Sequence, residues 1–275
     1  MVEEIKKNWV APIVEKELLK VKHRVLTKDR DWVVVYDGEE GVGKSVLAMQ
    51  HAKVLDPNFD LDHVVFTADD FIRVIKDPKT KRGTAIVLDE AFSSANSRAS
   101  LTEVNKSMIA VATEMRQKNL FVLMVLPSFF DLDRYFAIWR CRALFHLYFS
   151  PDEDRRYILF PKDEKKKLYL FGKKFYNYNK PHSPFPPFNF PNHYVVDEMA
   201  YRQKKAEAFK KRQVSHQAKV WLSQRDAFAK YIYKTMTISQ EELAKIPSLF
   251  GSIPLHQQNV SRIIQSIDES IPFTA

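Results

Sequence analysis

Glycine is scarce in this chain, and its placement constrains the fold more than any other feature. The 275 residues contain six glycines, and three of them, Gly38, Gly41 and Gly43, lie close together. A chain so poor in glycine uses it where the backbone needs a positive φ or a close approach to a ligand. An apolar, β-branched run at 32–36 precedes the cluster, and helical spacing follows from residue 44. This order predicts a strand, a tight loop and a helix.

The cluster matches the pattern G-x-x-x-x-G-K-[ST] of a phosphate-binding loop. In that pattern, backbone N–H groups at the start of the helix bind nucleotide phosphates. Lys44 faces the β- and γ-phosphates, and the Ser45 hydroxyl binds Mg²⁺. The expected cofactors are ATP and Mg²⁺, and the alternative is a chance match in a glycine-bearing turn. The expected nucleotide-binding residues are Gly38, Glu39, Glu40, Gly41, Val42, Gly43, Lys44, Ser45 and Val46.

A second motif, which is acidic, follows the glycine-rich loop by about forty residues. The apolar run 84–88 has the pattern of a buried strand and ends in Asp89 and Glu90. Asp89 is expected to bind Mg²⁺ opposite Ser45, and Glu90 to take a proton from the attacking water. The alternative is that both carboxylates cap the next helix.

The adjacent Asp89 and Glu90 resemble the ATPase division of P-loop proteins that includes the RecA-like and AAA+ families. The resemblance covers residues 30–150 and implies ATP hydrolysis. Members of this division place a polar sensor of the γ-phosphate after the fourth strand, which gives Ser128 that role. A serine at such a position is also a common turn residue.

The stretch from Glu114 to Arg142 resembles the late core of DNA-pumping ATPases, the FtsK–HerA translocases and Zot-like phage assembly ATPases. It departs from them in lacking the usual Gln after the sensor strand. The resemblance implies a homo-oligomer in which an arginine finger reaches the neighbouring subunit's γ-phosphate. Arg116 ranks first because it ends a helix expected to point towards the sensor, and each candidate has a surface or packing role as its alternative. The other candidates are Arg98, Arg134, Arg140 and Arg142.

Composition sets the outer bounds. With 45% hydrophobic and 28% charged residues, the chain can bury one large core and a smaller one. A single cysteine, Cys141, excludes an internal disulfide and fits a reducing cytoplasm. No run of eighteen apolar residues occurs, so a soluble, cytoplasmic protein without a membrane span is expected.

The basic charge is unevenly distributed. Residues 1–150 carry 22 Lys and Arg against 21 Asp and Glu, whereas residues 151–275 carry 21 against 13. The excess therefore lies outside the motifs and indicates a polyanionic partner, although a solvated lysine-rich face gives the same numbers.

Strands and helices alternate through the first half, which predicts an α/β fold with a parallel sheet covered on both faces. A hairpin is expected at 155–160 and 167–171, followed by an aromatic and proline-rich strap at 175–194 that packs on the core. Four regions result: a helical segment 1–30, a P-loop NTPase domain 31–172, the strap with a charged helix 173–213, and a helical domain 214–275.

The last region resembles a helix-turn-helix, of a winged type. A capping box at 239–242 opens a short helix, and residues 256–266 form a second helix similar to the recognition helices of bacterial and archaeal regulators. Its turn is longer than usual, and the alternative is a small bundle for protein contacts. The residues expected to face DNA, preferably double-stranded, are Gln257, Gln258, Ser261, Arg262 and Gln265.

Together these features predict an ATP-hydrolysing, DNA-associated motor of the packaging or translocation type. Two alternatives stay open. One is an AAA+-type DNA loader or a regulator of transposition or replication. The other is a nucleotide-dependent protein-assembly switch with no DNA role.

Overall fold

The computed structural model describes residues 9–89, 109–211 and 231. The chain divides into two compact units, Met1–Lys205 and Ala206–Ala275. The first unit mixes helices with a mostly parallel sheet, which confirms the predicted α/β class. In the second unit, the described residues 206–211 and 231 are helical. The predicted helix-turn-helix lies outside the described residues, and the four predicted regions stay a prediction.

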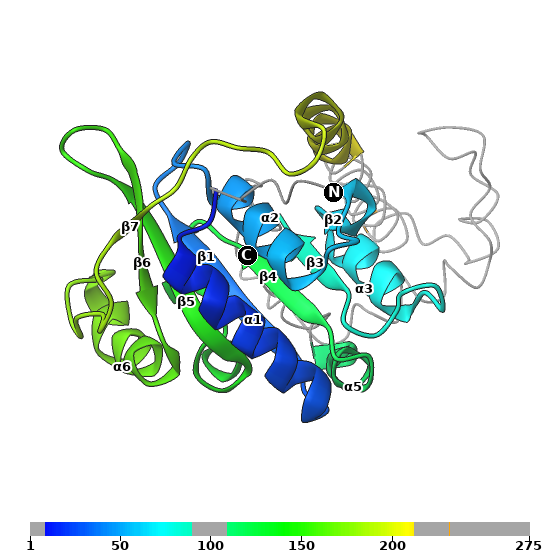
Figure 1. The fold of residues 1–275 in the computed structure, drawn as a ribbon, viewed down its shortest axis with the longest axis horizontal. Helices are drawn as coiled ribbons and strands as arrows, with labels where there is room; N and C mark the ends of the chain where they lie inside the picture. Colours follow the sequence, from blue (N-terminus) through cyan, green and yellow to red (C-terminus); the bar gives the residue numbers. More distant parts are fainter. Residues whose placement is uncertain (1–8, 90–108, 212–230, 232–275) are drawn as a thin grey trace, which may run out of the picture. The chain divides into compact units, whose positions relative to one another are not determined.

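The sheet has seven strands in the order β2-β3-β4-β1-β5-β6-β7 among the described residues (Figure 1). The first five in that order are parallel, while β6 runs antiparallel to β5 and β7 antiparallel to β6. β4 therefore separates the strand that leads into the glycine-rich loop from the strand that leads to Asp89. The strands are β1 (Trp32–Gly38), β2 (Val64–Val65), β3 (Ala85–Leu88), β4 (Phe121–Val125), β5 (Cys141–Phe149), β6 (Arg155–Phe160) and β7 (Phe188–Asn189).

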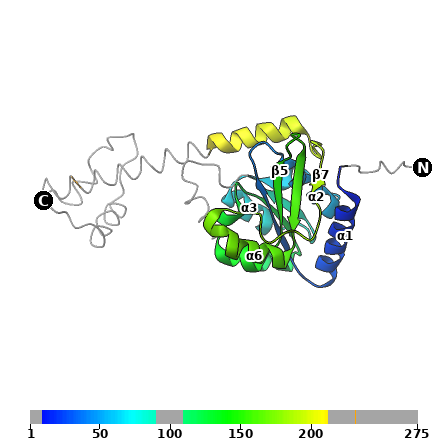
Figure 2. The same cartoon turned by 90° about the vertical axis from the view of Figure 1, so that its left-hand side faces the viewer.

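Helices cover both faces of the sheet, as apolar strands buried on two sides require. On one face α2 (Lys44–Leu55) packs on the strands, and α1 (Pro12–Thr27) packs on α2. The other face shares a core with α3 (Ala68–Lys76), α5 (Ala112–Gln117) and α6 (Lys162–Gly172). Figure 2 views the sheet from its β7 edge, with α1 on one side and α6 on the other. No helix in the described ranges is long and apolar enough to cross a bilayer.

Local sequence signals explain most of these boundaries. Thr67 caps α3, because its side chain accepts a hydrogen bond from the backbone N–H of Asp70. Between β4 and β5 the chain forms two short turns, a 3-10 turn, η2 (Phe129–Asp131), and a π-helical turn, η3 (Phe136–Arg140). Two further short turns are η1 (Leu61–His63) and η4 (Lys173–Phe175).

The predicted hairpin is wrong in its second half. β6 forms as expected, but it pairs with β5, and residues 162–172 are the helix α6. Lys165, Leu168, Tyr169 and Gly172 are the buried positions of α6, and their spacing is helical. The buried ammonium of Lys165 donates to the carbonyls of Ala137 and Ile138 at the end of η3. The helix gives the Lys165 ammonium these two acceptors, which explains why the apolar run at 168–171 did not form a strand.

Candidate functional site

The glycine-rich loop joins the end of β1 to the start of α2, and its glycines have the backbone angles that the sequence required. Gly38, Gly41 and Gly43 have φ of 124°, 76° and 99°. A Cβ placed on Gly38 would lie 1.8 Å from the carbonyl oxygen of Leu147 in β5. Gly43 is the left-handed N-cap of α2, so the first N–H groups of that helix, which have no intrahelical partner, lie at the loop. This end of α2 is suited to binding an anion.

Lys44 closes the loop. Its ammonium donates to the backbone carbonyls of Gly38 and Glu39, each at 2.8 Å. Val42 and Val46 are buried and anchor the loop, whereas Glu39, Glu40 and Gly41 are exposed. The positive charge therefore lies beside the N-terminus of α2, where phosphate groups would be bound.

Ser45 and Asp89 meet although 44 positions separate them in the sequence. The Ser45 hydroxyl donates to Asp89 Oδ1 at 2.8 Å, and the Asp89 side chain is fully buried at the end of β3. A hydroxyl and a carboxylate beside a phosphate site form the donor set that Mg²⁺ takes in nucleotide-binding proteins, where water and phosphate complete the coordination. These two residues fit Mg²⁺. Glu90, the expected base, lies outside the described residues.

The other oxygen of Asp89 is contacted by the segment that follows β7. The Tyr201 hydroxyl donates to Asp89 Oδ2, and the Lys205 ammonium lies 3.7 Å from the same atom. Tyr201 is buried, with 4% of its surface exposed. Sequence reasoning missed both residues, because nothing in a charged helix marks which side chains return to a strand more than a hundred residues earlier.

Ser128 belongs to a buried polar cluster at the same edge of the sheet. Its hydroxyl lies 3.2 Å from the Tyr178 hydroxyl and accepts from the backbone N–H of Phe130. Tyr178 in turn donates to the fully buried Asp37 at 2.6 Å. The sensor role of Ser128 stays a prediction. Its contacts with the N–H of Phe130 and the hydroxyl of Tyr178 also fit the alternative, in which Ser128 is a turn residue.

Asp37 organises that cluster. Besides Tyr178, it accepts from the backbone N–H of Phe129 at 2.7 Å and lies 2.9 Å from His146 Nδ1. Burial, and then the neighbouring Asp37 carboxylate, raise the pKa of Tyr178, so the phenol stays protonated. Sequence reasoning did not single out Asp37, although a carboxylate in the otherwise apolar β1, one residue before the loop, was a usable signal.

Arg116 lies at the opposite edge of the sheet from the loop. It is exposed near the end of α5, just before β4 begins, and β4 begins beside the first residue of β1. The expectation that its helix points towards the sensor is therefore wrong, because α5 ends where the parallel strands begin. A finger acts on a neighbouring subunit, so its role stays a prediction.

The structure also places the three other arginine candidates that lie in the described part of the chain. Arg140 forms an ion pair with Asp31, which favours its packing role, and Arg134 is exposed. Arg142 is half-buried in β5. Arg98 lies outside the described residues, as do the expected DNA-facing residues Gln257, Gln258, Ser261, Arg262 and Gln265.

The strap passes beside the loop. A Cβ placed on Gly43 would lie 3.3 Å from the Phe190 ring and 3.6 Å from Nη1 of Arg155, the first residue of β6. Gln50 in α2 donates to the carbonyls of Pro191 and His193 at 3.0 and 2.8 Å. Phe190 is buried against Tyr157, so this aromatic residue packs on the core as expected. Sequence reasoning missed Arg155 and Gln50, since only the folded strap brings them to the loop.

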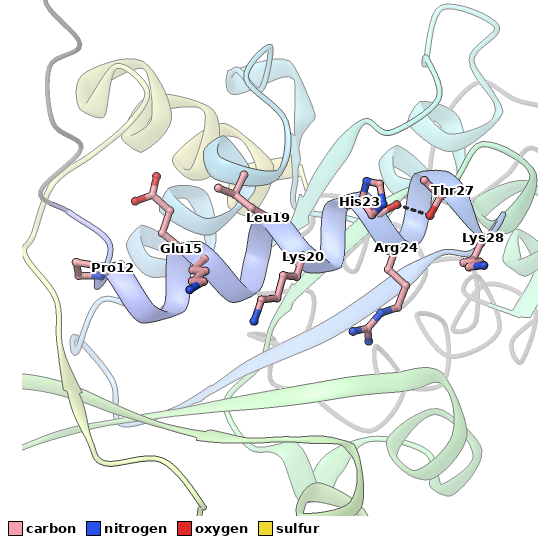
Figure 3. Close-up of a pocket in the computed structure, with 9 residues that line it drawn as sticks. Pro12, Glu15, Leu19, Lys20, His23, Arg24, Thr27 and Lys28 are labelled. Carbon is pink, nitrogen blue, oxygen red and sulfur yellow. Dashed lines mark hydrogen bonds between the residues drawn. The ribbon is translucent and has the colours of Figure 1, made fainter.

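A shallow groove on the surface lies elsewhere, along one side of α1 (Figure 3). It is lined by one continuous helical segment, from Pro12 to Lys28. None of the expected site residues lines it, so the groove and the glycine-rich loop are separate features.

The α/β fold is consistent with that of P-loop NTPases in its strand order, in the conformation of the glycine-rich loop and in the hydrogen bond between Ser45 and Asp89. No protein-family model and no curated protein matches the chain. Among solved structures it is similar to the N-terminal domain of zonular occludens toxin from Neisseria meningitidis, with 17% identity over 51% of this chain and 90% of that one and a TM-score of 0.35. It is also similar to the VirB11 ATPase from the Brucella suis type IV secretion system, with 12% identity over 62% of each chain and a TM-score of 0.31.

Proposed function

We propose that the protein binds Mg²⁺ and ATP at the glycine-rich loop and hydrolyses the nucleotide. The observation that carries this proposal is the 2.8 Å hydrogen bond from Ser45 to Asp89, because it joins the end of the phosphate-binding loop to the acidic strand across β4. A chance glycine-rich turn has no reason to be paired with a buried carboxylate from a distant strand.

The chain's own groups divide the work as follows. The N–H groups at the start of α2 bind the phosphates, and Lys44 exchanges its carbonyl contacts for the β- and γ-phosphate oxygens. Ser45 and Asp89 hold Mg²⁺, which when bound neutralises charge on those oxygens. Glu90 accepts a proton from water as the water oxygen bonds to the γ-phosphorus and the bond to the β–γ bridging oxygen breaks.

Nucleotide binding to the full chain tests the proposal. Lys44→Ala removes the charge at the loop and is expected to abolish binding of fluorescent ATP, while Lys20→Ala is expected to bind like the wild type. Lys20 is a matched control because it lies on α1 in an exposed ion pair with Glu17, a contact of little energetic weight. Wild-type affinity in Lys44→Ala would refute the assignment of the loop.

We further propose that this ATPase acts on DNA as an oligomeric motor, with the basic second half of the chain as the DNA-binding part. The charge distribution and the helix-turn-helix resemblance support this step. Stimulation of ATP turnover by double-stranded DNA is the direct test, and a translocation assay separates a motor from a loader. The DNA role would be refuted if the rate of ATP turnover were the same with and without DNA and the protein did not bind DNA at low salt.

A nucleotide-dependent switch is the second candidate, and the contact of Tyr201 with Asp89 favours it. The carboxylate expected to hold Mg²⁺ is also the anchor of the segment that leads into the second unit. The switch predicts that Mg²⁺ and ATP, or the substitution Tyr201→Phe, increase protease cleavage between residues 194 and 211. Identical digestion patterns with and without nucleotide would contradict it.

A further inference from the structure

We infer that Arg155 binds the phosphates of the nucleotide held by the loop of its own chain, as a positioning cation that no sequence motif assigns. This inference rests on the proposed nucleotide site and adds one ligand to it. Three observations carry it: the position of the guanidinium, its lack of a protein partner at Nη1, and the way the strap fixes it.

The sheet brings Arg155 to the loop. Gly38, the first loop residue, pairs with Leu147 in β5, and Arg155 pairs with Phe149 two residues further along the same strand. The first residue of β6 is therefore at the edge of the sheet where the loop begins. The side chain extends to Gly43, because a Cβ on that glycine would lie 3.6 Å from Arg155 Nη1. The guanidinium thus flanks the N-cap of α2.

Arg155 has an unmet need for an anion. Its Nη1 is buried and has no hydrogen-bond partner among the described residues. A guanidinium keeps its proton at any physiological pH, and a buried N–H group without a hydrogen-bond partner is unfavourable. Among the described residues Arg155 forms no ion pair, and the adjacent carboxylate of Asp154 lies 3.5 Å from Nη2 of Arg156 instead. A phosphate at the start of α2 would provide the partner, and arginine is well suited to binding phosphate.

The strap holds this arrangement. The backbone N–H of Phe190 donates to the Arg155 carbonyl at 3.4 Å, and the Phe190 ring lies on the same side of Gly43. Gln50 fixes the next turn of the strap through the carbonyls of Pro191 and His193. The backbone of Arg155 is therefore fixed by β5 on one side and by the strap on the other, next to the loop, before any nucleotide binds.

Arg156 supplies a matched control. It is the next residue of β6, so its side chain leaves the opposite face of the sheet, and it is 34% exposed beside Asp154. Arg156→Gln makes the same chemical change one position away from the loop.

The experiment measures Kd for fluorescent ADP and ATP with the full-length variants, together with the shift in Tm that saturating ADP produces. Arg155→Gln is expected to weaken binding about 10-fold or more and to reduce the ADP-induced shift, whereas Arg156→Gln stays within about 2-fold of the wild type. The Tm without nucleotide should stay equal or rise, because the substitution removes a buried N–H group that has no hydrogen-bond partner.

Equal affinity of Arg155→Gln and wild type, while Lys44→Ala fails to bind, would overturn the inference and leave the proposed function intact. Failure of the wild type to bind nucleotide would overturn both. If Arg155→Gln does not fold, Arg155→Lys decides the question. It keeps one charge but loses the planar fork, so roughly 3- to 10-fold weaker ADP binding is expected, and unchanged affinity would overturn the inference.

Discussion

His51 should make the protein sensitive to mild acid. It lies in α2, two turns beyond Lys44, with its side chain fully buried and its Nδ1 2.9 Å from the Tyr36 hydroxyl. Burial lowers the pKa of His51 from 6.5 to about 3. The folded protein therefore keeps this imidazole neutral at pH values where the unfolded chain binds a proton.

The difference between the folded and unfolded pKa of His51 determines how the free energy of unfolding changes with pH. A depressed folded pKa contributes stability that is fully present above pH 6.5 and is lost as pH falls towards 3. Each pH unit in that window costs about 1.4 kcal/mol, so moving from pH 7 to pH 4.5 should remove roughly 2–3 kcal/mol through His51 alone. Because His51 is in the helix that carries the loop, nucleotide binding should weaken with it.

Urea unfolding at pH 7 and pH 4.5 measures this loss, with His51→Gln as the comparison. Glutamine does not titrate, and its amide oxygen can accept a hydrogen bond from the Tyr36 hydroxyl. All other titrating groups are the same in the two proteins, so their contributions to the pH dependence cancel in the comparison. Between pH 7 and pH 4.5 the wild type should lose roughly 2–3 kcal/mol more stability than His51→Gln. If both proteins lose the same stability between the two pH values, the reasoning about His51 is refuted.

The other predictions concern the loop, the base and the DNA-binding part. Gly38→Ala should lower the yield of folded protein, since its Cβ would lie 1.8 Å from the Leu147 carbonyl oxygen, and a normal Tm would contradict this. Glu90→Gln should bind ATP with normal affinity but stop phosphate release, because an amide cannot accept the proton from water; turnover within a few-fold of wild type would move the base elsewhere. Replacing Gln258 and Arg262 with Ala in the full chain should weaken DNA binding and its salt dependence without changing basal ATP turnover, with unchanged affinity at moderate salt favouring the protein-contact alternative.

The sequence predicted those parts of the fold that depend on local pattern. Apolar runs identified β1, β3 and β4, and the glycine spacing identified the loop and the start of α2. The pairing of Ser45 with Asp89 was also predictable, because two motifs of known chemistry were expected at one edge of a parallel sheet. The strand expected at 167–171 was wrong, since a short apolar run carries no information about the buried Lys165, whose ammonium the helix places beside two carbonyls.

Tyr201 and Gln50 were not predictable, because their roles arise from contacts between distant segments. Tyr201 reaches Asp89 across 112 positions, and Gln50 reaches Pro191 across 141. Neither residue type marks a site by itself. Arg116 is an arginine at the end of a helix, which suits an arginine finger, but the sequence placed it at the wrong edge of the sheet. α5 ends where the parallel strands begin, and the residue type carries no information about that direction.

The two outermost strands of the sheet bear on how copies of this chain could assemble. β2 and β7 are each two residues long in the described part of the chain. Short edges leave few unpaired backbone groups on which another chain could add a strand, which is a common protection against aggregation. In the described part of the chain, a homo-oligomer of the kind predicted here would therefore use helices and loops, rather than long strand edges, for contacts between subunits. Its subunits would be able to shift against one another without breaking a shared sheet.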